Sequence, residues 1–149
     1  MGLDMYLTAR RSFWSFDEDD QKYIDTLKNL FPEYDQMNPT SICFEAAYWR
    51  KANAIHKWFV DNVQDGKDDC SEYYVSTDQL KDLFSVCEQV IADKSKAEEL
   101  LPSASGYFFG STDYDEYYFQ DVQFTIDKLK NIVDNANYEL CSFFYQSSW

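Results

Sequence analysis

Alternation of apolar and polar residues marks both ends of the chain as strands. Apolar residues alternate with more polar ones over residues 3–8, which is the spacing of a strand with one buried face. Residues 138–145 are rich in strand-forming types and could pair with this first strand. Between them, residues 73–75 are expected to form a short strand or an extended link. Residues 106–112 could form another strand or bring a glycine backbone close to a different segment.

Four other segments have apolar residues three and four positions apart, as helices do. The first, 17–31, begins with acidic residues that suit a helix N-terminus. The central segment is 44–63. The third starts at a capping box that opens with Ser76 and ends by Pro102, and the last covers 114–133.

These elements predict a single α+β domain that covers residues 1–149. Their order is β-α-α-β-α-β-α-β, with the helices on one side of a small sheet. A chain of this length can bury roughly two thirds of the surface that its unfolded form exposes. Aromatic residues make up 19% of the chain, so we expect a dense core.

The helix expected at 44–63 carries two polar residues on its apolar side. Lys51 falls between Phe44 and Trp58 in helical projection, and His56 is the only histidine of the chain. Lys51 could lay its methylene groups over Trp58 and release its ammonium to water, or face a cleft and meet a carboxylate or phosphate. His56 could be a core imidazole with satisfied hydrogen bonds, or a group that transfers a proton or contacts a ligand.

The cleft alternative predicts a site for a small, nucleotide-like ligand on this helix. An aromatic side chain would stack on a base and a basic one would meet the phosphate. His56 and Asn53, one turn apart, would orient the ligand or move a proton. The candidate ligand-binding residues are Tyr48, Arg50, Lys51, Asn53, His56, Trp58, Ser111 and Thr112.

The segment 110–116 has two interpretations. Ser111, Thr112 or Asp113 could cap the first turn of the helix that follows, with the later acids complementing its dipole. The same amides and hydroxyls could instead hold an anion after Gly110, although the neighbouring acids would repel a phosphate unless a metal intervened. No phosphate-binding loop with Gly-Lys-Ser or Gly-Lys-Thr is present.

Negative charge is concentrated in the second part of the chain. The chain has 27 acidic and 13 basic residues, a formal net charge of −14, and residues 61–149 hold 18 of the acids but only 6 of the bases. Duplex nucleic acid is therefore not an expected partner, because it requires clustered Lys and Arg. An acidic surface could instead imitate phosphate and occupy a basic groove of another protein. The candidate protein-binding residues are Asp68, Asp69, Asp113, Asp115 and Glu116.

The cysteine pattern favours a reduced, cytoplasmic protein without a metal or cofactor. The four cysteines are far apart, form no CxxC pair and accompany one histidine. No apolar run is long enough to span a bilayer, and the acidity argues against a membrane surface. The chain has no Gly-x-Ser-x-Gly motif, and the sequence favours a non-enzymatic role. Twelve Tyr and twelve Phe exceed the needs of a small sheet, and a homodimer could bury the excess.

Five segments are distinctive enough to serve as motifs: Met1-Gly2-Leu3-Asp4-Met5-Tyr6-Leu7, the central Tyr48-Trp49-Arg50-Lys51-Ala52-Asn53-Ala54-Ile55-His56, Asp68-Asp69-Cys70, Gly106-Tyr107-Phe108-Phe109-Gly110-Ser111-Thr112-Asp113-Tyr114-Asp115-Glu116, and the ending Tyr145-Gln146-Ser147-Ser148-Trp149. Nearly end to end, they resemble a family of small uncharacterised proteins carried by bacteriophages and prophages. The resemblance implies an accessory protein that acts in bacterial cytoplasm. Small acidic phage proteins of this kind often look like inhibitors of a host defence protein. The resemblance implies no catalytic residues.

Overall fold

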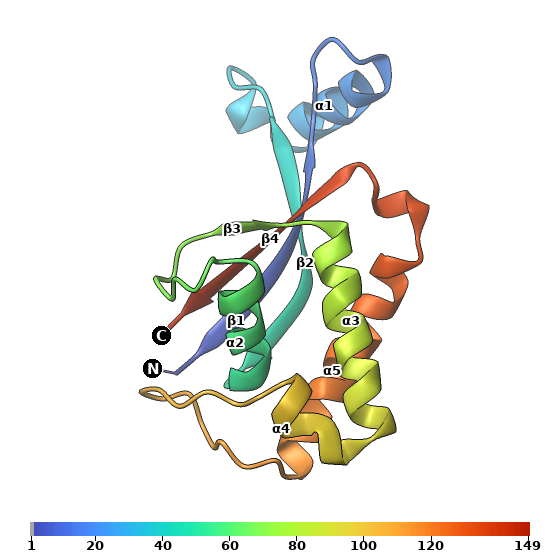
Figure 1. Cartoon of the computed structure of the whole chain (residues 1–149). Coiled ribbons are helices and arrows are strands. Elements are labelled where there is room, and N and C mark those ends of the chain that lie inside the picture. Colours follow the sequence, from blue (N-terminus) through green and yellow to red (C-terminus); the bar gives the residue numbers. More distant parts are fainter. Residues whose placement is uncertain (1) are drawn as a thin grey trace.

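The last strand of the chain pairs with the first at the centre of a four-stranded antiparallel sheet (Figure 1). The computed structural model describes residues 2–149. The strands are β1 Asp4–Ser12, β2 Ser41–Arg50, β3 Tyr73–Val75 and β4 Cys141–Ser148, in the order β2-β1-β4-β3. The predicted pairing of the two ends and the predicted short strand at 73–75 are both confirmed.

All helices except the first pack against one face of this sheet (Figure 1). The helices are α1 Glu18–Leu30, α2 Asn53–Asn62, α3 Thr77–Ala92, α4 Ala97–Leu100 and α5 Glu116–Val133, with 3₁₀ turns η1 Pro32–Tyr34, η2 Lys94–Lys96 and η3 Ala136–Tyr138. The predicted capping box is present: the Ser76 hydroxyl accepts a hydrogen bond from the Gln79 amide, and the Gln79 side chain accepts one from the Ser76 amide. The expected α+β domain is confirmed.

The prediction of one helix over residues 44–63 is wrong. Residues 41–50 form β2, and the helix begins only at Asn53. Burial in the last part of β2 has a period of two, because Ala47 and Trp49 are buried while the residues that follow each of them are exposed. β2 pairs with β1 along most of its length. Pairing with a distant strand therefore decides the conformation of a segment whose residue types suit either structure.

Residues 106–112 form a loop, so the expected strand there is also absent. The helix cap lies later than predicted as well. The Asp115 carboxylate accepts a hydrogen bond from the Tyr118 amide at 3.1 Å and caps α5, in place of residues 111–113. The observed order is β-α-β-α-β-α-α-α-β.

The core lies between the sheet and helices α2, α3 and α5. The rings of Phe59 and Tyr145 stack with their centroids 3.9 Å apart and an angle of 6° between their planes. The indole N–H of Trp49 donates to the Thr125 hydroxyl at 2.9 Å. This buried hydrogen bond joins β2 to α5 and fixes the helical layer on the sheet.

β1 and β2 continue beyond the rest of the sheet and carry α1 and η1 at their far end (Figure 1). We call residues 13–40 the appendage. Asp20, which is buried, attaches it to the strands: its carboxylate accepts hydrogen bonds from the Arg11 guanidinium at 2.5 Å and from the Trp14 amide at 2.9 Å. The hydrogen bond from Arg11, which has the larger effect, and that from Trp14 hold the pKa of Asp20 below its usual value.

Candidate functional site

A cleft of about 350 Å³ lies where the turn between β2 and α2 meets the loop before α5. Arg50 and Lys51 contribute from the turn, and Asp113, Asp115 and Asp121 contribute from the loop and α5. The remaining lining is Ala52, Asn53, Ala54, Ile55, Gly110, Ser111, Tyr117, Tyr118, Gln120 and Val122. The cleft thus brings together, in one small volume, basic and acidic side chains that are about 60 to 70 residues apart in the sequence.

The turn at Lys51 shapes one side of the cleft. Lys51 has a φ of +59°, and its amide donates to the Leu3 carbonyl at 2.7 Å. Gly110 lies directly against it: a Cβ added to Gly110 would be 3.3 Å from the Cβ of Lys51, and the φ of Gly110 is +86°. The loop at 106–112 therefore makes the close backbone approach that the sequence offered as the alternative to a strand.

Asn53 holds the loop in place. Its side chain is buried, donates to the carbonyls of Phe109 at 3.0 Å and Ser111 at 2.8 Å, and accepts from the Ala104 amide at 3.1 Å. These three bonds leave the amide group of Asn53 with little capacity for a ligand. Asn53 is thus a positioning residue for the loop that borders the cleft.

The charges in the cleft are not paired with one another. Within residues 2–149, Arg50 forms one ion pair, with Asp4 at 3.9 Å, and Lys51 forms none. Burial, followed by the charge of Asp115, raises the pKa of Asp121 to about 6. α2 begins beside these groups, and no side chain caps its N-terminus. The cleft can therefore attract an anionic and a cationic group together.

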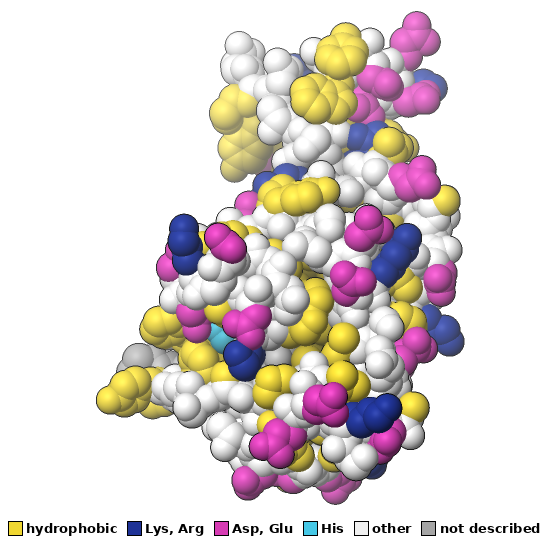
Figure 2. Space-filling model, in the orientation of Figure 1, with side chains coloured by type: hydrophobic (Ala, Val, Ile, Leu, Met, Phe, Trp, Pro, Cys, Tyr) yellow, Lys and Arg dark blue, Asp and Glu magenta, His cyan; other side chains and the backbone are white. Residues whose placement is uncertain are grey.

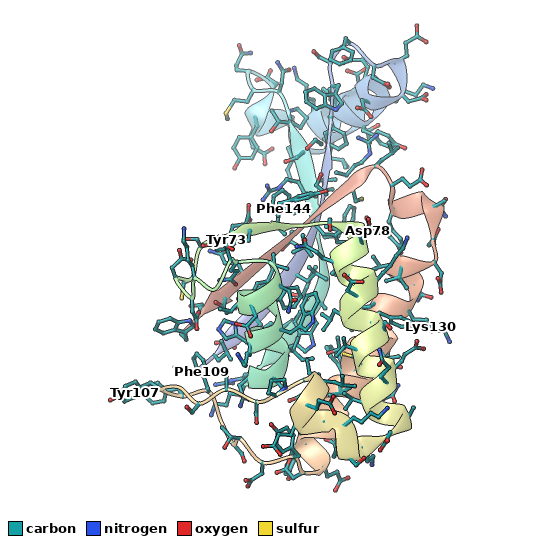
Figure 3. All side chains as sticks on the ribbon, viewed as in Figure 1. Tyr73, Asp78, Tyr107, Phe109, Lys130 and Phe144 are labelled. Atoms are coloured by element: carbon teal, nitrogen blue, oxygen red, sulfur yellow. The ribbon has the colours of Figure 1, made fainter. Side chains whose placement is uncertain are left out.

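His56 lies in the core, outside the cleft. Its Nδ1 is 2.7 Å from the Tyr145 hydroxyl and its Nε2 is 3.0 Å from an Asp68 carboxylate oxygen. Because a carboxylate only accepts, the neutral ring carries its proton on Nε2 and accepts from Tyr145 at Nδ1. Burial, and then the nearby charge of Asp68, raises the pKa of Tyr145 well above its usual value. Phe109 packs edge-on against the imidazole, and Figure 3 shows it directed towards α2.

The other aromatic candidates also lie outside the cleft. Tyr48 is on the sheet face opposite the helices, where its hydroxyl donates to Asp4 and its ring contacts that of Tyr6. Trp58 is buried in α2 against Phe59. Of the eight candidate ligand-binding residues, the cleft gathers Arg50, Lys51, Asn53 and Ser111 and leaves the remaining four elsewhere.

Several acidic candidates already have internal partners. Asp68 binds His56 and accepts a hydrogen bond from the Trp149 indole at 3.0 Å. Asp69 accepts from the Ser71 amide and the Tyr73 hydroxyl, which lower its pKa. The exposed carboxylates of Asp113 and Glu116 lie near the start of α5 and can face a partner.

Acidic side chains cover the helical layer of the protein. Residues 77–139, which contain α3, α4 and α5, hold 13 acids and 5 bases, and 12 of those acids are exposed. Figure 2 shows acidic side chains scattered over this layer and gathered near its end at α4. We call Glu98, Glu99, Asp113 and Glu116 the acidic end.

Asp121 and the appendage were missed by the sequence reasoning. Asp121 is three residues after Tyr118 and directly before Val122, so its place on the apolar face of α5 could have been noticed. The appendage had a weaker signal: aromatic residues both before and after α1, outside any helical pattern.

No protein-family model matches this chain, and neither curated proteins nor solved structures gave a significant match. Among residues 2–149, no helix combines the length and the apolar composition needed to cross a membrane. Nowhere in the described part of the chain do three or more His, Cys, Asp or Glu side chains gather as metal ligands would.

Proposed function

We propose that this protein is a phage accessory protein that binds and inhibits a host bacterial protein through an acidic surface. The observation that carries the proposal is the exposure of 12 acids, against 5 bases in all, on residues 77–139, which contain α3, α4 and α5. Such a surface complements a basic groove, and occupying that groove would exclude its normal anionic ligand. The phage setting and the bacterial cytoplasm come from the resemblance of the sequence motifs, and the host partner could be an antiviral defence protein.

Neutralising the acidic end should weaken this complex. We expect Glu98→Gln/Glu99→Gln/Glu116→Gln to raise the dissociation constant roughly tenfold, because exposed ion pairs are each worth about 0.2–1 kcal/mol. The partner is first retained on the tagged protein from host lysate at low salt and identified. Calorimetry of the purified pair then gives the affinity. Affinity of the unaltered protein should fall steeply between about 50 and about 300 mM salt.

A variant of opposite sign provides the control. Lys94 and Lys96 are exposed near α4, and Lys94→Gln/Lys96→Gln makes the same region more negative. This double variant should bind at least as tightly as the unaltered protein. A complex that is equally tight at both salt concentrations, or that both variants weaken alike, would show that acidic charge does not drive binding.

The charged groups of the cleft, which are not paired with one another, support a second candidate function, the binding of a small ligand. Arg50 and Lys51 together with the uncapped start of α2 suit a carboxylate or phosphate, while Asp113 and Asp121 suit a cationic group. A zwitterion fits this pattern better than a nucleotide, whose phosphates the acids would repel. Tyr117 is exposed at the cleft and could cover the ligand.

Native mass spectrometry of protein purified gently from its host tests the cleft. The unaltered protein should retain a small mass. Lys51→Ala should retain that mass about tenfold less or weaker still, because Arg50 is then the one basic side chain left in the cleft lining to meet an anion. Retention should also weaken as the pH falls from about 7 to about 5, because Asp121, with a pKa of about 6, is then protonated.

Lys57→Ala is the matched control for this test, because Lys57 pairs with Asp61 at 2.6 Å outside the cleft. It should retain the small mass as the unaltered protein does. Equal retention by Lys51→Ala and Lys57→Ala would place the ligand outside the cleft. If no small mass is retained at all, the ligand-binding proposal fails and the inhibitor proposal is the one that remains.

A further inference from the structure

The appendage exposes most of its apolar side chains. Of the ten apolar residues in 13–40, seven are exposed: Trp14, Phe16, Tyr23, Leu30, Phe31, Tyr34 and Met37. Ile24 and Phe13 are buried. Exposed apolar residues that gather in one place, rather than being scattered singly, mark interaction surfaces.

Part of this apolar surface forms a groove of about 590 Å³. It lies between the C-terminal half of α1, η1 and the start of β2, and its volume is within the roughly 300–1000 Å³ of pockets that bind ligands. The apolar lining consists of Leu27, Phe31, Tyr34, Met37, Pro39 and Ile42. The side chains of Phe31, Tyr34 and Met37 are 48, 54 and 60% exposed, so they are open to a partner.

Unpaired acids accompany the groove. The appendage has seven acids and two lysines. Lys22 pairs with Asp19 at 3.1 Å, and Lys28, which lines the groove, donates to the neutral Asn38 side chain at 3.4 Å. Glu33 and Asp35 flank Tyr34 in the sequence, are exposed, and form no ion pair within residues 2–149. Figure 2 shows hydrophobic side chains on the appendage close to acidic ones.

We infer that this groove binds a basic amphipathic helix, with apolar residues on one face and Lys or Arg beside them. The apolar face would enter among Phe31, Tyr34 and Met37, and the basic residues would meet Glu33 and Asp35. The charge selects this occupant over a second copy of the chain, because a self-contact would bring an appendage of net charge −5 against a chain of net charge −14. The inference rests on the proposed function in assigning the helix to the inhibited host protein.

Two synthetic peptides test the groove directly on the full chain. Each is a helix of about 16 residues with leucine on one face. The first peptide has lysine on the opposite face. The second, matched peptide has glutamate in place of each lysine. Fluorescence anisotropy at low salt should show binding of the lysine peptide alone. Phe31→Ser/Met37→Ser should weaken that binding about tenfold or more, and Glu33→Gln/Asp35→Asn should weaken it less.

The control variant is Tyr107→Ser/Leu140→Ser, which removes two exposed apolar side chains outside the appendage. Figure 3 shows Tyr107 pointing away from the body at the opposite end of the molecule. This variant should bind the lysine peptide as the unaltered protein does. All four substituted apolar residues are exposed, so melting temperatures should remain similar.

Three results would overturn the inference: equal binding of both peptides, equal binding by Phe31→Ser/Met37→Ser and its control, or self-association of the unaltered protein that Phe31→Ser/Met37→Ser abolishes. The last would identify a second copy as the occupant. The proposed function fails separately. It fails if no host protein is retained, or if neutralising the acidic end has no effect, whether or not the groove binds the lysine peptide.

Discussion

Replacing His56 by alanine should lower the free energy of unfolding by about 3–5 kcal/mol. The imidazole is 1% exposed and bridges Tyr145 and Asp68 with hydrogen bonds of 2.7 and 3.0 Å. Its removal leaves the fully buried Tyr145 hydroxyl without this partner and opens a cavity beside Phe109. Both effects are unfavourable in a densely packed core. Urea unfolding followed by tryptophan fluorescence measures the loss.

Two comparisons separate this structural role from a functional one. Lys51→Ala should change stability by no more than about 0.5 kcal/mol, because Lys51 is exposed. Asp68→Asn keeps a hydrogen-bonding group next to His56 and to the Trp149 indole, so it should cost less than His56→Ala. If His56→Ala unfolded like the unaltered protein but lost a binding activity, the imidazole would belong to a functional site instead.

The His56 network also accounts for residues at the C-terminus of the chain. Asp68 binds His56 with one carboxylate oxygen and the indole of Trp149 with the other. Trp149 also packs against Phe109, the neighbour of His56. The end of the chain, the loop after α2 and the loop before α5 thus meet around one buried ring. Residues of four of the five sequence motifs are thus engaged in a single structural cluster.

Local signals in the sequence predicted most of the elements. The capping box at Ser76, the short strand at 73–75 and the strands at both ends each depend on residues within a few positions of one another. The segment 41–50 differs because its residues suit a helix or a strand. Its pairing with β1, about 40 residues earlier, decides between them.

The candidate site could be predicted only in part, because the turn between β2 and α2 and the loop before α5 bring its residues together. Arg50 and Lys51 were selected for the wrong reason, as members of a helix, whereas they lie at the end of a strand and in a turn of positive φ. No spacing in the sequence indicates that Gly110 packs against Lys51. Asp121 was predictable in principle, since an acid on an apolar helix face must lie in a cleft or find a partner.

Asn53→Ala should lower the free energy of unfolding by about 2–4 kcal/mol and release the loop that borders the cleft. All three hydrogen bonds of this buried side chain disappear, and the carbonyls of Phe109 and Ser111 lose a donor. The Ala104 amide donates a hydrogen bond to the Asn53 side-chain oxygen at 3.1 Å, so without Asn53 its hydrogen should exchange with solvent much faster. Urea unfolding measures the first effect and amide hydrogen exchange the second.

The change in amide exchange should be specific to the loop, because all three hydrogen bonds from Asn53 to it are made by side-chain atoms. Asn53→Asp keeps an acceptor for Ala104 but loses both donors and buries a charge, so it should destabilise at least as much as alanine. Asn62→Ala removes an exposed side chain that donates to the Trp58 carbonyl at the other end of α2 and should cost no more than about 1 kcal/mol. If the Ala104 amide stayed protected in Asn53→Ala, the loop would be held by other contacts. The cleft would then keep its shape without Asn53, and loss of ligand in that variant would point to direct contact.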